Sequence, residues 1–376
     1  MVEAQAVRGA FRVRWYNDAE QNAAWRDDKG SAVCCLPLPW YLTVVKIEQI
    51  IIRKLRALTE RNDCLYGPSN TPFSGVCLRG PNGSGKTSYL EAIAELWQWF
   101  RRCTKQRGYA KPETELLQEA ELVAVLLVDL PGPRPRMWLA YGDAAAHGPL
   151  PAGPENPYTL KGGRVLWNPE VLDYWAKAFE QAETGFSPET RPPNMVVIGA
   201  ENKWVRPVRS RELLSRDSTP AFVVVPRYLP QARGQSHVEG MMRTLSLARQ
   251  DKWTVLAKWV RELRSGALVL DGFEDDQRPR FRLRSGTRVT VDKLSAGERS
   301  LLINLCMILR WLSEGGIVLL DEPELHQHLS LMRGSLAVLH AMVEDDFQGQ
   351  LIVASHAPEV WDHFRAAQAF IDLGAN

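Results

Sequence analysis

The stretch Gly80-Pro81-Asn82-Gly83-Ser84-Gly85-Lys86-Thr87 decides what kind of fold this chain adopts. It matches the pattern G-x-x-x-x-G-K-[S/T] in full. A short apolar run at 75–78 precedes it, and apolar residues at helical spacing follow it over 87–102. A strand, a glycine-rich turn and a helix in this order predict a phosphate-binding loop at the end of a buried strand.

Each residue type in this loop suits a bound triphosphate. Glycines allow backbone N–H groups to turn inward around a phosphate without clashes of a Cβ atom, and the following helix adds a partial positive charge. Lys86 can reach the β- and γ-phosphates, and the Thr87 hydroxyl can bind Mg²⁺. The predicted ligands are therefore ATP and Mg²⁺. A glycine-rich turn that matches by chance is the alternative, and the flanking strand and helix disfavour it.

A second motif is the stretch Ile317-Val318-Leu319-Leu320-Asp321-Glu322-Pro323. Its apolar part predicts a buried strand, and its two carboxylates follow at the carboxyl end, where open α/β sheets bind ligands. Asp321 is expected to hold Mg²⁺, and Glu322 to orient and deprotonate the attacking water. Taken alone, the acidic pair would be a solvated turn. Beside a complete phosphate loop, the catalytic interpretation is the better one.

A third motif, Leu294-Ser295-Ala296-Gly297-Glu298-Arg299-Ser300, lies about one helix before that strand. Ser295 and Glu298 have the spacing of a capping box for a helix that continues through Leu309. Capping is a purely structural role. Gly297 also leaves the first amides of this helix uncovered, so the helix end could receive an anion.

A fourth motif is Ser355-His356, which follows the apolar run 351–354. A lone histidine after a strand usually has no special role. Here it follows the acidic pair by one strand–helix unit, so in a parallel sheet it would emerge at the same edge as Asp321 and the phosphate loop. An imidazole there could sense the γ-phosphate.

Periodicity and turn residues predict the remaining elements. From 291 to the end, helices and strands alternate as in a parallel α/β layer. The interval 105–191 is rich in proline and glycine and predicts strands or hairpins joined by irregular loops. The other expected elements are a strand at 10–16, a helix at 42–58 that ends near 61–63, strands at 122–130, 194–198 and 221–225, a helical region at 240–264, and a strand or hairpin at 281–291.

Composition excludes few functions. The chain has 376 residues, 45% of them hydrophobic, and a net charge of +2, which allows a large core and neither demands nor excludes nucleic acid. Its 6 cysteines and 7 histidines do not follow the spacing of a zinc site. No signal core and no apolar run of about 18 residues occurs, so we expect no membrane span and a cytoplasmic location.

Two basic segments raise the question of DNA. Arg278, Arg280, Arg282 and Arg284 alternate, so on a strand they would line one face. A second run comprises Lys203, Arg206, Arg209, Arg211 and Arg216. Either could follow a phosphate backbone or dock an acidic protein. No readout motif accompanies these charges, which slightly favours a solvated surface or an edge strand guarded by charge.

Together the four motifs, in this order, resemble those of the ABC ATPase superfamily. The string 321–328, DEPELHQH, is similar to the DEPExHxHP string of the overcoming-lysogenisation-defect type ATPases, a soluble branch related to chromosome-maintenance and recombination ATPases. The resemblance covers about 72–104 and 294–373. It implies an α/β fold of the ABC-type ATPase head, in which a mixed sheet with a P-loop core carries an antiparallel β lobe and an inserted helical or irregular lobe. The expected parts are 1–104, 105–290 and 291–376, which form one composite ATPase domain.

The resemblance also implies a head-to-head dimer. Each ATP would lie between the phosphate loop of one copy and segment 295–298 of the other. By this analogy Ser295, Gly297 and Glu298 help to bind the nucleotide in trans, and Ser295 and Gly297 contact the γ-phosphate. His356 would be the switch histidine and act with Glu322 in catalysis.

The sequence departs from the family pattern at several points. Leu329 stands where the family has a proline after HxH. The glutamine of the lid has only Gln118 as a candidate, and the aromatic residue that stacks on adenine has Trp15 and Tyr66. The segment between the first strand and the phosphate loop, expected to be helical, is longer than usual.

Three functions remain open at this stage. The interval between Thr87 and Leu294 is too rich in proline for a long coiled coil, and the few residues after His356 leave no room for a fused nuclease domain. The leading hypothesis is therefore an ATP-hydrolysing switch that controls a separate nuclease or toxin, in bacterial antiphage defence. The alternatives are a DNA-repair or recombination ATPase that binds DNA directly and a scaffold that binds ATP without turnover.

Overall fold

The structure is a computed structural model that describes residues 4–7, 10–13, 45–67, 69–142, 158–161, 164–185, 191–200, 205, 220, 222–229, 231, 236–263, 266–325 and 327–374. Its contacts divide the chain into two units, Met1–Pro37 and Leu38–Asn376. In the first unit, β1 (Ala4–Val7) pairs antiparallel with β2 (Ala10–Val13). The strand predicted at 10–16 is confirmed over 10–13, and the rest of it lies outside the described residues.

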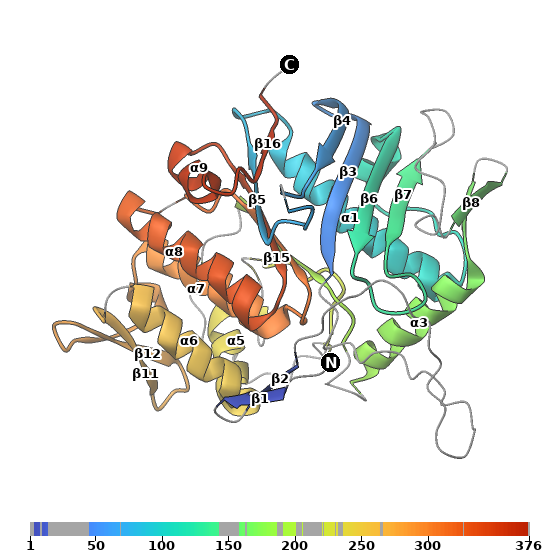
Figure 1. Ribbon diagram of the computed structural model, residues 1–376. Coiled ribbons are helices and arrows are strands. Elements are labelled where there is room, and N and C mark those ends of the chain that lie inside the picture. Colours follow the sequence, from blue (N-terminus) through green and yellow to red (C-terminus); the bar gives the residue numbers. More distant parts are fainter. Residues whose placement is uncertain are drawn as a thin grey trace, which may run out of the picture. The chain divides into compact units, whose positions relative to one another are not determined.

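The second unit contains a parallel sheet (Figure 1). Its strand order is β10-β14-β15-β5-β16, and every neighbouring pair is parallel. Side chains of the inner strands are buried on both faces, as the continuous aliphatic runs require. The strands are β5 (Gly75–Arg79), β10 (Met195–Ile198), β14 (Ile317–Asp321), β15 (Gln350–Ser355) and β16 (Phe370–Asp372).

Two hydrophobic cores lie on the two faces of this sheet, because successive side chains of a strand point to opposite faces. Leu319 and Ile352 belong to the core that contains α1 (Lys86–Gln106), whereas Leu320 and Val353 belong to the other. The second core is built with α5 (Val238–Ala248), α6 (Gln250–Leu263), α7 (Ala296–Trp311), α8 (Leu329–Ala341) and α9 (Pro358–Phe364). The helix–strand alternation predicted from 291 onward is confirmed.

A second sheet of this unit is antiparallel, with the order β4-β3-β6-β7. Its strands are β3 (Lys46–Leu55), β4 (Leu58–Cys64), β6 (Leu122–Val128) and β7 (Met137–Gly142). Figure 1 shows these strands (blue to green) on the side of the parallel sheet opposite to α7 and α8. The strand predicted at 122–130 is confirmed by β6.

The helix predicted at 42–58 is wrong, because β3 and β4 form a hairpin there. A β-bulge between Ile47 and Gln49 shifts the buried face of β3. As a result Ile47 and Ile50 are both fully buried at a spacing of three residues, which imitates helical periodicity. The β-branched run 50–52 favours a strand, and Arg56, with a φ of 52°, begins the turn. The departure noted above, a long helical segment before the phosphate loop, is therefore this hairpin.

The interval 105–290 contributes to both sheets. β6 and β7 lie in the antiparallel sheet, and β10, the strand predicted at 194–198, forms an edge of the parallel one. This interval also contains α2 (Glu115–Glu119), α3 (Pro169–Thr184) and the hairpin of β8 (Tyr158–Lys161) with β9 (Arg164–Trp167). The expected boundaries at 104 and 290 stay a prediction.

Two further predictions of this interval have different outcomes. The helical region at 240–264 is confirmed by α5 and α6, and the hairpin at 281–291 by β12 (Pro279–Leu283) and β13 (Arg288–Thr290), which pair with β11 (Leu268–Phe273) in a three-stranded sheet. The prediction of a strand at 221–225 is wrong, because residues 222–225 lie beside β10 without forming a strand. Val224 and Pro226 accept hydrogen bonds from β10 through their carbonyls, but a proline has no N–H to continue a ladder.

Within the described residues, no helix combines the length and the apolar character needed to cross a bilayer.

Candidate nucleotide site

The loop 80–85 joins β5 to α1 and has room only for glycine at key points. Gly83 and Gly85 have φ values of 80° and 91°, in the left-handed region that favours glycine. A Cβ atom on Gly80 would lie 2.7 Å from the Ser84 hydroxyl, and one on Gly85 would lie 2.8 Å from the Leu58 side chain. The loop therefore keeps its backbone exposed at the end of the strand.

The first turn of α1 has the properties of an anion site. Its N-cap, Gly85, has no side chain that could accept from the first amides, and the first turn contains no acidic residue. In addition, the Ser84 hydroxyl is buried without a hydrogen-bond partner. Uncapped amides and an orphaned hydroxyl at a positive helix end fit a phosphate group.

Lys86 places its charge inside this loop. Its side chain is only 5% exposed, and its ammonium donates hydrogen bonds to the carbonyls of Gly80 and Pro81, at 2.9 and 2.8 Å. The loop thus surrounds a buried cation. Pro81, Asn82 and Gly83 form the exposed crest of the loop.

Thr87 and Asp321 meet although they are 234 positions apart. The Thr87 hydroxyl donates to the Asp321 carboxylate, with 2.8 Å between the oxygens. Asp321 ends β14 and is 5% exposed. A hydroxyl and a carboxylate oxygen side by side next to a phosphate loop are ligands that Mg²⁺ accepts.

Glu322 follows at a sharp turn. Its φ of 43° is unusual for a residue other than glycine and costs about 1–3 kcal/mol, a strain that is typical of functional sites. The turn directs the Glu322 carboxylate toward His356, whose Nδ1 atom lies 3.3 Å from Glu322 Oε1. The carboxyl ends of β14 and β15 thus bring these two residues together.

Glu324 is a member of the site that the sequence did not single out. Its Oε1 atom lies 3.3 Å from His356 Nδ1 and accepts from the Ser355 hydroxyl at 2.7 Å and from the His356 backbone N–H at 3.3 Å. His356 therefore lies against two carboxylates. The only signal in the sequence was the second glutamate of the string DEPE.

The segment 295–298 begins α7 with the predicted capping box. The Ser295 hydroxyl accepts from the Glu298 backbone N–H at 3.3 Å, and the Glu298 carboxylate accepts from the Ser295 backbone N–H at 2.9 Å. Gly297 is buried, whereas Ser295 is exposed. Since α7 leads into β14 through a short connection, its N-terminus faces the edge at which β14 ends.

The weaker candidates fall in different places. Gln118 lies in α2 and donates its amide to the carbonyl of Pro112 at 3.1 Å, a local contact. Tyr66 lies just after β4 and is 40% exposed. Trp15 and the basic residues at 203, 206, 209, 211 and 216 lie outside the described residues.

Three of the four alternating arginines, Arg278, Arg280 and Arg282, form ion pairs within the protein. Arg278 pairs with Glu239 and Asp292, each at 2.7 Å. Arg280, Arg282 and Arg288 surround the carboxylate of Asp271, at 3.2 to 3.6 Å. The engagement of Arg278 by two carboxylates supports a structural role for this residue rather than a place in a DNA-binding stripe.

The chain matches no protein-family model and no curated protein. Among solved structures it is similar to the head domain of SMC from Thermotoga maritima, with 13% identity, a TM-score of 0.43, and 87% of this chain and 94% of that one covered. An SMC head bound to the C-winged helix domain of ScpA shares 14% identity with this chain at a TM-score of 0.46, and 87% of this chain and 93% of that one are covered. A dimeric bacterial ABC transporter cassette shares 12% identity with this chain at a TM-score of 0.36, and 88% of this chain and 95% of that one are covered.

Because these identities and TM-scores are low, the fold class is defined by the chain's own geometry. A parallel sheet carries the phosphate loop, and an antiparallel sheet packs on the face that α1 covers. This arrangement confirms the predicted α/β fold class, a mixed fold with a phosphate-loop core and an antiparallel sheet.

Proposed function

We propose that this protein binds ATP with Mg²⁺ at the loop 80–87 and hydrolyses it. The observation that supports this proposal is the meeting of Thr87, Asp321 and the pair Glu322–His356 at the edge of the sheet where the phosphate loop begins. Three parallel strands, β5, β14 and β15, contribute these residues with their carboxyl ends. Open α/β sheets bind their ligands at this edge.

Each residue has a role that its chemistry suits. The backbone of 80–85 and the ammonium of Lys86 would hold the phosphates, and the oxygens of Thr87 and Asp321 would hold Mg²⁺. When bound, the ion neutralises charge on the phosphate oxygens. Glu322 orients a water and accepts its proton, and His356 holds the Glu322 carboxylate in place through their contact.

The same proposal includes a second copy of the chain. The exposed Ser295 and the first backbone amides of α7 would contact the γ-phosphate bound by the partner copy, and Glu298 would keep the capping turn in shape. ATP would then join two heads, and its hydrolysis would release them.

Mixing two inactive variants tests this composite site. Lys86→Ala removes the loop cation, and Ser295→Arg places a bulky cation on the segment proposed to act in trans. In an equal mixture about half of the dimers are mixed, and one of their two sites is intact, so we expect about a quarter of the wild-type ATPase rate if the sites act independently.

The ATPase rate of each variant alone serves as the control and should be near background. A mixture that stays as inactive as its components, while both variants remain folded by circular dichroism, would contradict a site shared between copies.

We further propose that the ATP-dependent dimer controls a separately encoded effector, such as a nuclease or toxin, in bacterial antiphage defence. The similarity of the string 321–328 to that of the overcoming-lysogenisation-defect type ATPases motivates this step. We expect the product of the neighbouring gene to co-purify with the Glu322→Gln variant and to be released in the Lys86→Ala variant. Equal recovery with both would contradict control by ATP.

A further inference from the structure

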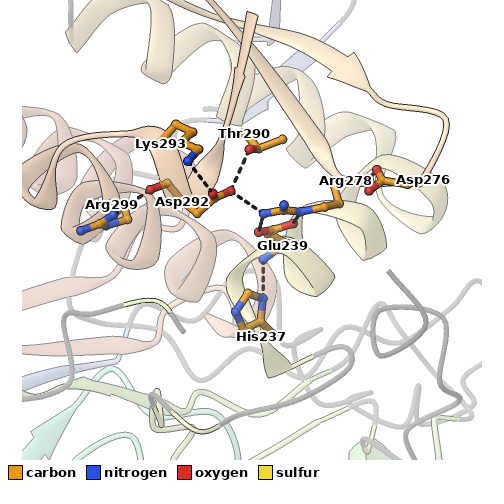
Figure 2. A network of polar contacts seen from close by, with 8 residues as sticks. All are labelled: His237, Glu239, Asp276, Arg278, Thr290, Asp292, Lys293 and Arg299. Carbon is orange, nitrogen blue, oxygen red and sulfur yellow. Dashed lines mark hydrogen bonds and ion pairs between the residues drawn. The ribbon is translucent and has the colours of Figure 1, made fainter. Parts of the chain in front are cut away.

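An ion network connects the three-stranded sheet to the segment that begins α7 (Figure 2). Arg278, just before β12, forms a bidentate pair with Glu239 of α5, from Nε at 2.9 Å and from Nη2 at 2.7 Å. Its Nη2 atom also donates to Asp292 at 2.7 Å. Asp292 lies in the short 3-10 turn Val291–Lys293, three residues before Ser295. One guanidinium therefore joins α5, β12 and this turn.

The charged groups of this network are largely buried, which favours their present paired geometry. The Glu239 side chain is 1% exposed and that of Arg278 is 17% exposed. Burial raises the pKa of Glu239 above its ordinary value, and the hydrogen bonds from Arg278 counteract that shift. Hydrogen bonding to Glu239 raises the pKa of Arg278. A buried ion pair that is satisfied on both sides fixes the positions of its partners.

Asp292 is held from several sides. The Thr290 hydroxyl donates to its carboxylate at 2.7 Å, and the Arg299 guanidinium donates to its backbone carbonyl at 3.1 Å. Figure 2 shows Asp292 between Arg278 on one side and Arg299 on the other. Arg299 is one turn into α7, so Asp292 is tied both to the body of the molecule and to the helix that Ser295 caps.

We infer that Asp292 is a positioning residue for Ser295. Through Arg278 it holds the turn 290–294 at a fixed distance from α5. The buried side chains of Val291 and Leu294 anchor the same turn. Among the described hydrogen bonds, the Ser295 side chain has only its capping partner Glu298. This inference depends on the proposed function, because it concerns the segment that would act in trans.

The experiment compares Asp292→Ala with Asp292→Asn in the full-length protein. Alanine removes the acceptor for Thr290 and Arg278, whereas asparagine keeps an oxygen at that position. Both variants leave the Arg278–Glu239 pair intact, so the buried charge of Glu239 keeps its partner. Asp271→Ala is the matched control, since Asp271 binds arginines of the same sheet but has no described contact with the turn 290–294.

For Asp292→Ala we expect kcat for Mg²⁺-ATP to fall roughly 10- to 100-fold, because a misplacement of about 1 Å costs on the order of 100-fold. Affinity for ATP at low protein concentration, where heads are monomeric, should change less than about twofold. ATP-induced dimerisation, measured by analytical ultracentrifugation, should weaken with kcat. Asp292→Asn should recover most of the rate, and the control should equal wild type.

Equal rates in Asp292→Ala and in the control would overturn the inference. So would a loss of monomer ATP affinity in parallel with kcat, because this would indicate a general loss of structure. The failure of the proposed function looks different, since wild type itself would then bind ATP no better than Lys86→Ala does.

Discussion

Replacement of Lys86 by alanine is expected to abolish ATP binding and, with it, all turnover. The ammonium is buried inside the loop and donates to two backbone carbonyls of that loop. Its removal would take away the only charged side chain of residues 80–87. Two charge-assisted hydrogen bonds to phosphate contribute about 3 kcal/mol or more together, so affinity should fall at least roughly 100-fold.

Isothermal titration calorimetry with Mg²⁺-ATP measures this effect. Lys105→Ala is a suitable control, because it removes a lysine from the last turn of the same helix, α1. If the Lys86→Ala variant bound ATP as tightly as the control, the loop would not be the nucleotide site and the functional proposal would fail.

Replacement of Glu322 by glutamine is expected to separate binding from turnover. Glutamine has the same shape, so the turn after β14 and the contact with His356 can persist. It cannot accept a proton from water, and the loss of a general base lowers a rate by about 100- to 10,000-fold. ATP should still bind, and because it is not consumed, the dimer that it joins should accumulate.

Two measurements check the second prediction. A phosphate-release assay gives the turnover, and sedimentation with and without Mg²⁺-ATP gives the dimer. Asp345→Asn makes the same isosteric change at an exposed position that precedes β15, at the end of that strand opposite to His356, and should leave both unchanged. Wild-type turnover in the Glu322→Gln variant would show that Glu322 takes no part in the chemistry. If the wild-type protein itself were inactive, a scaffold that binds ATP without hydrolysis would explain the result.

Local motifs made part of this structure predictable. The phosphate loop requires only a strand end, glycines that adopt positive φ, and a helix start, and these are properties of adjacent residues. The capping box of Ser295 and Glu298 is likewise local, and the structure has it. The run 317–320 is apolar throughout because both faces of β14 are covered.

The failures have an equally physical cause. The segment 46–55 has helical spacing only because a bulge moves its buried face, and a bulge depends on the partner strand β6. Arg278 belongs to a basic stripe by its spacing, yet its guanidinium is engaged by two carboxylates, Glu239 and Asp292, from other elements. Neither partner can be identified from the spacing of charges along the chain.

The sequence by itself determined the residue types of the site and the local geometry of the loop and of the cap, because short-range sterics and neighbouring hydrogen bonds set these features. Tertiary structure alone decided that β14 and β5 both lie beside β15, which brings Thr87 to Asp321 and lets the turn after β14 place Glu322 and Glu324 against His356. Strand order depends on the burial of side chains far apart in the chain, and this free energy is not a property of any single segment.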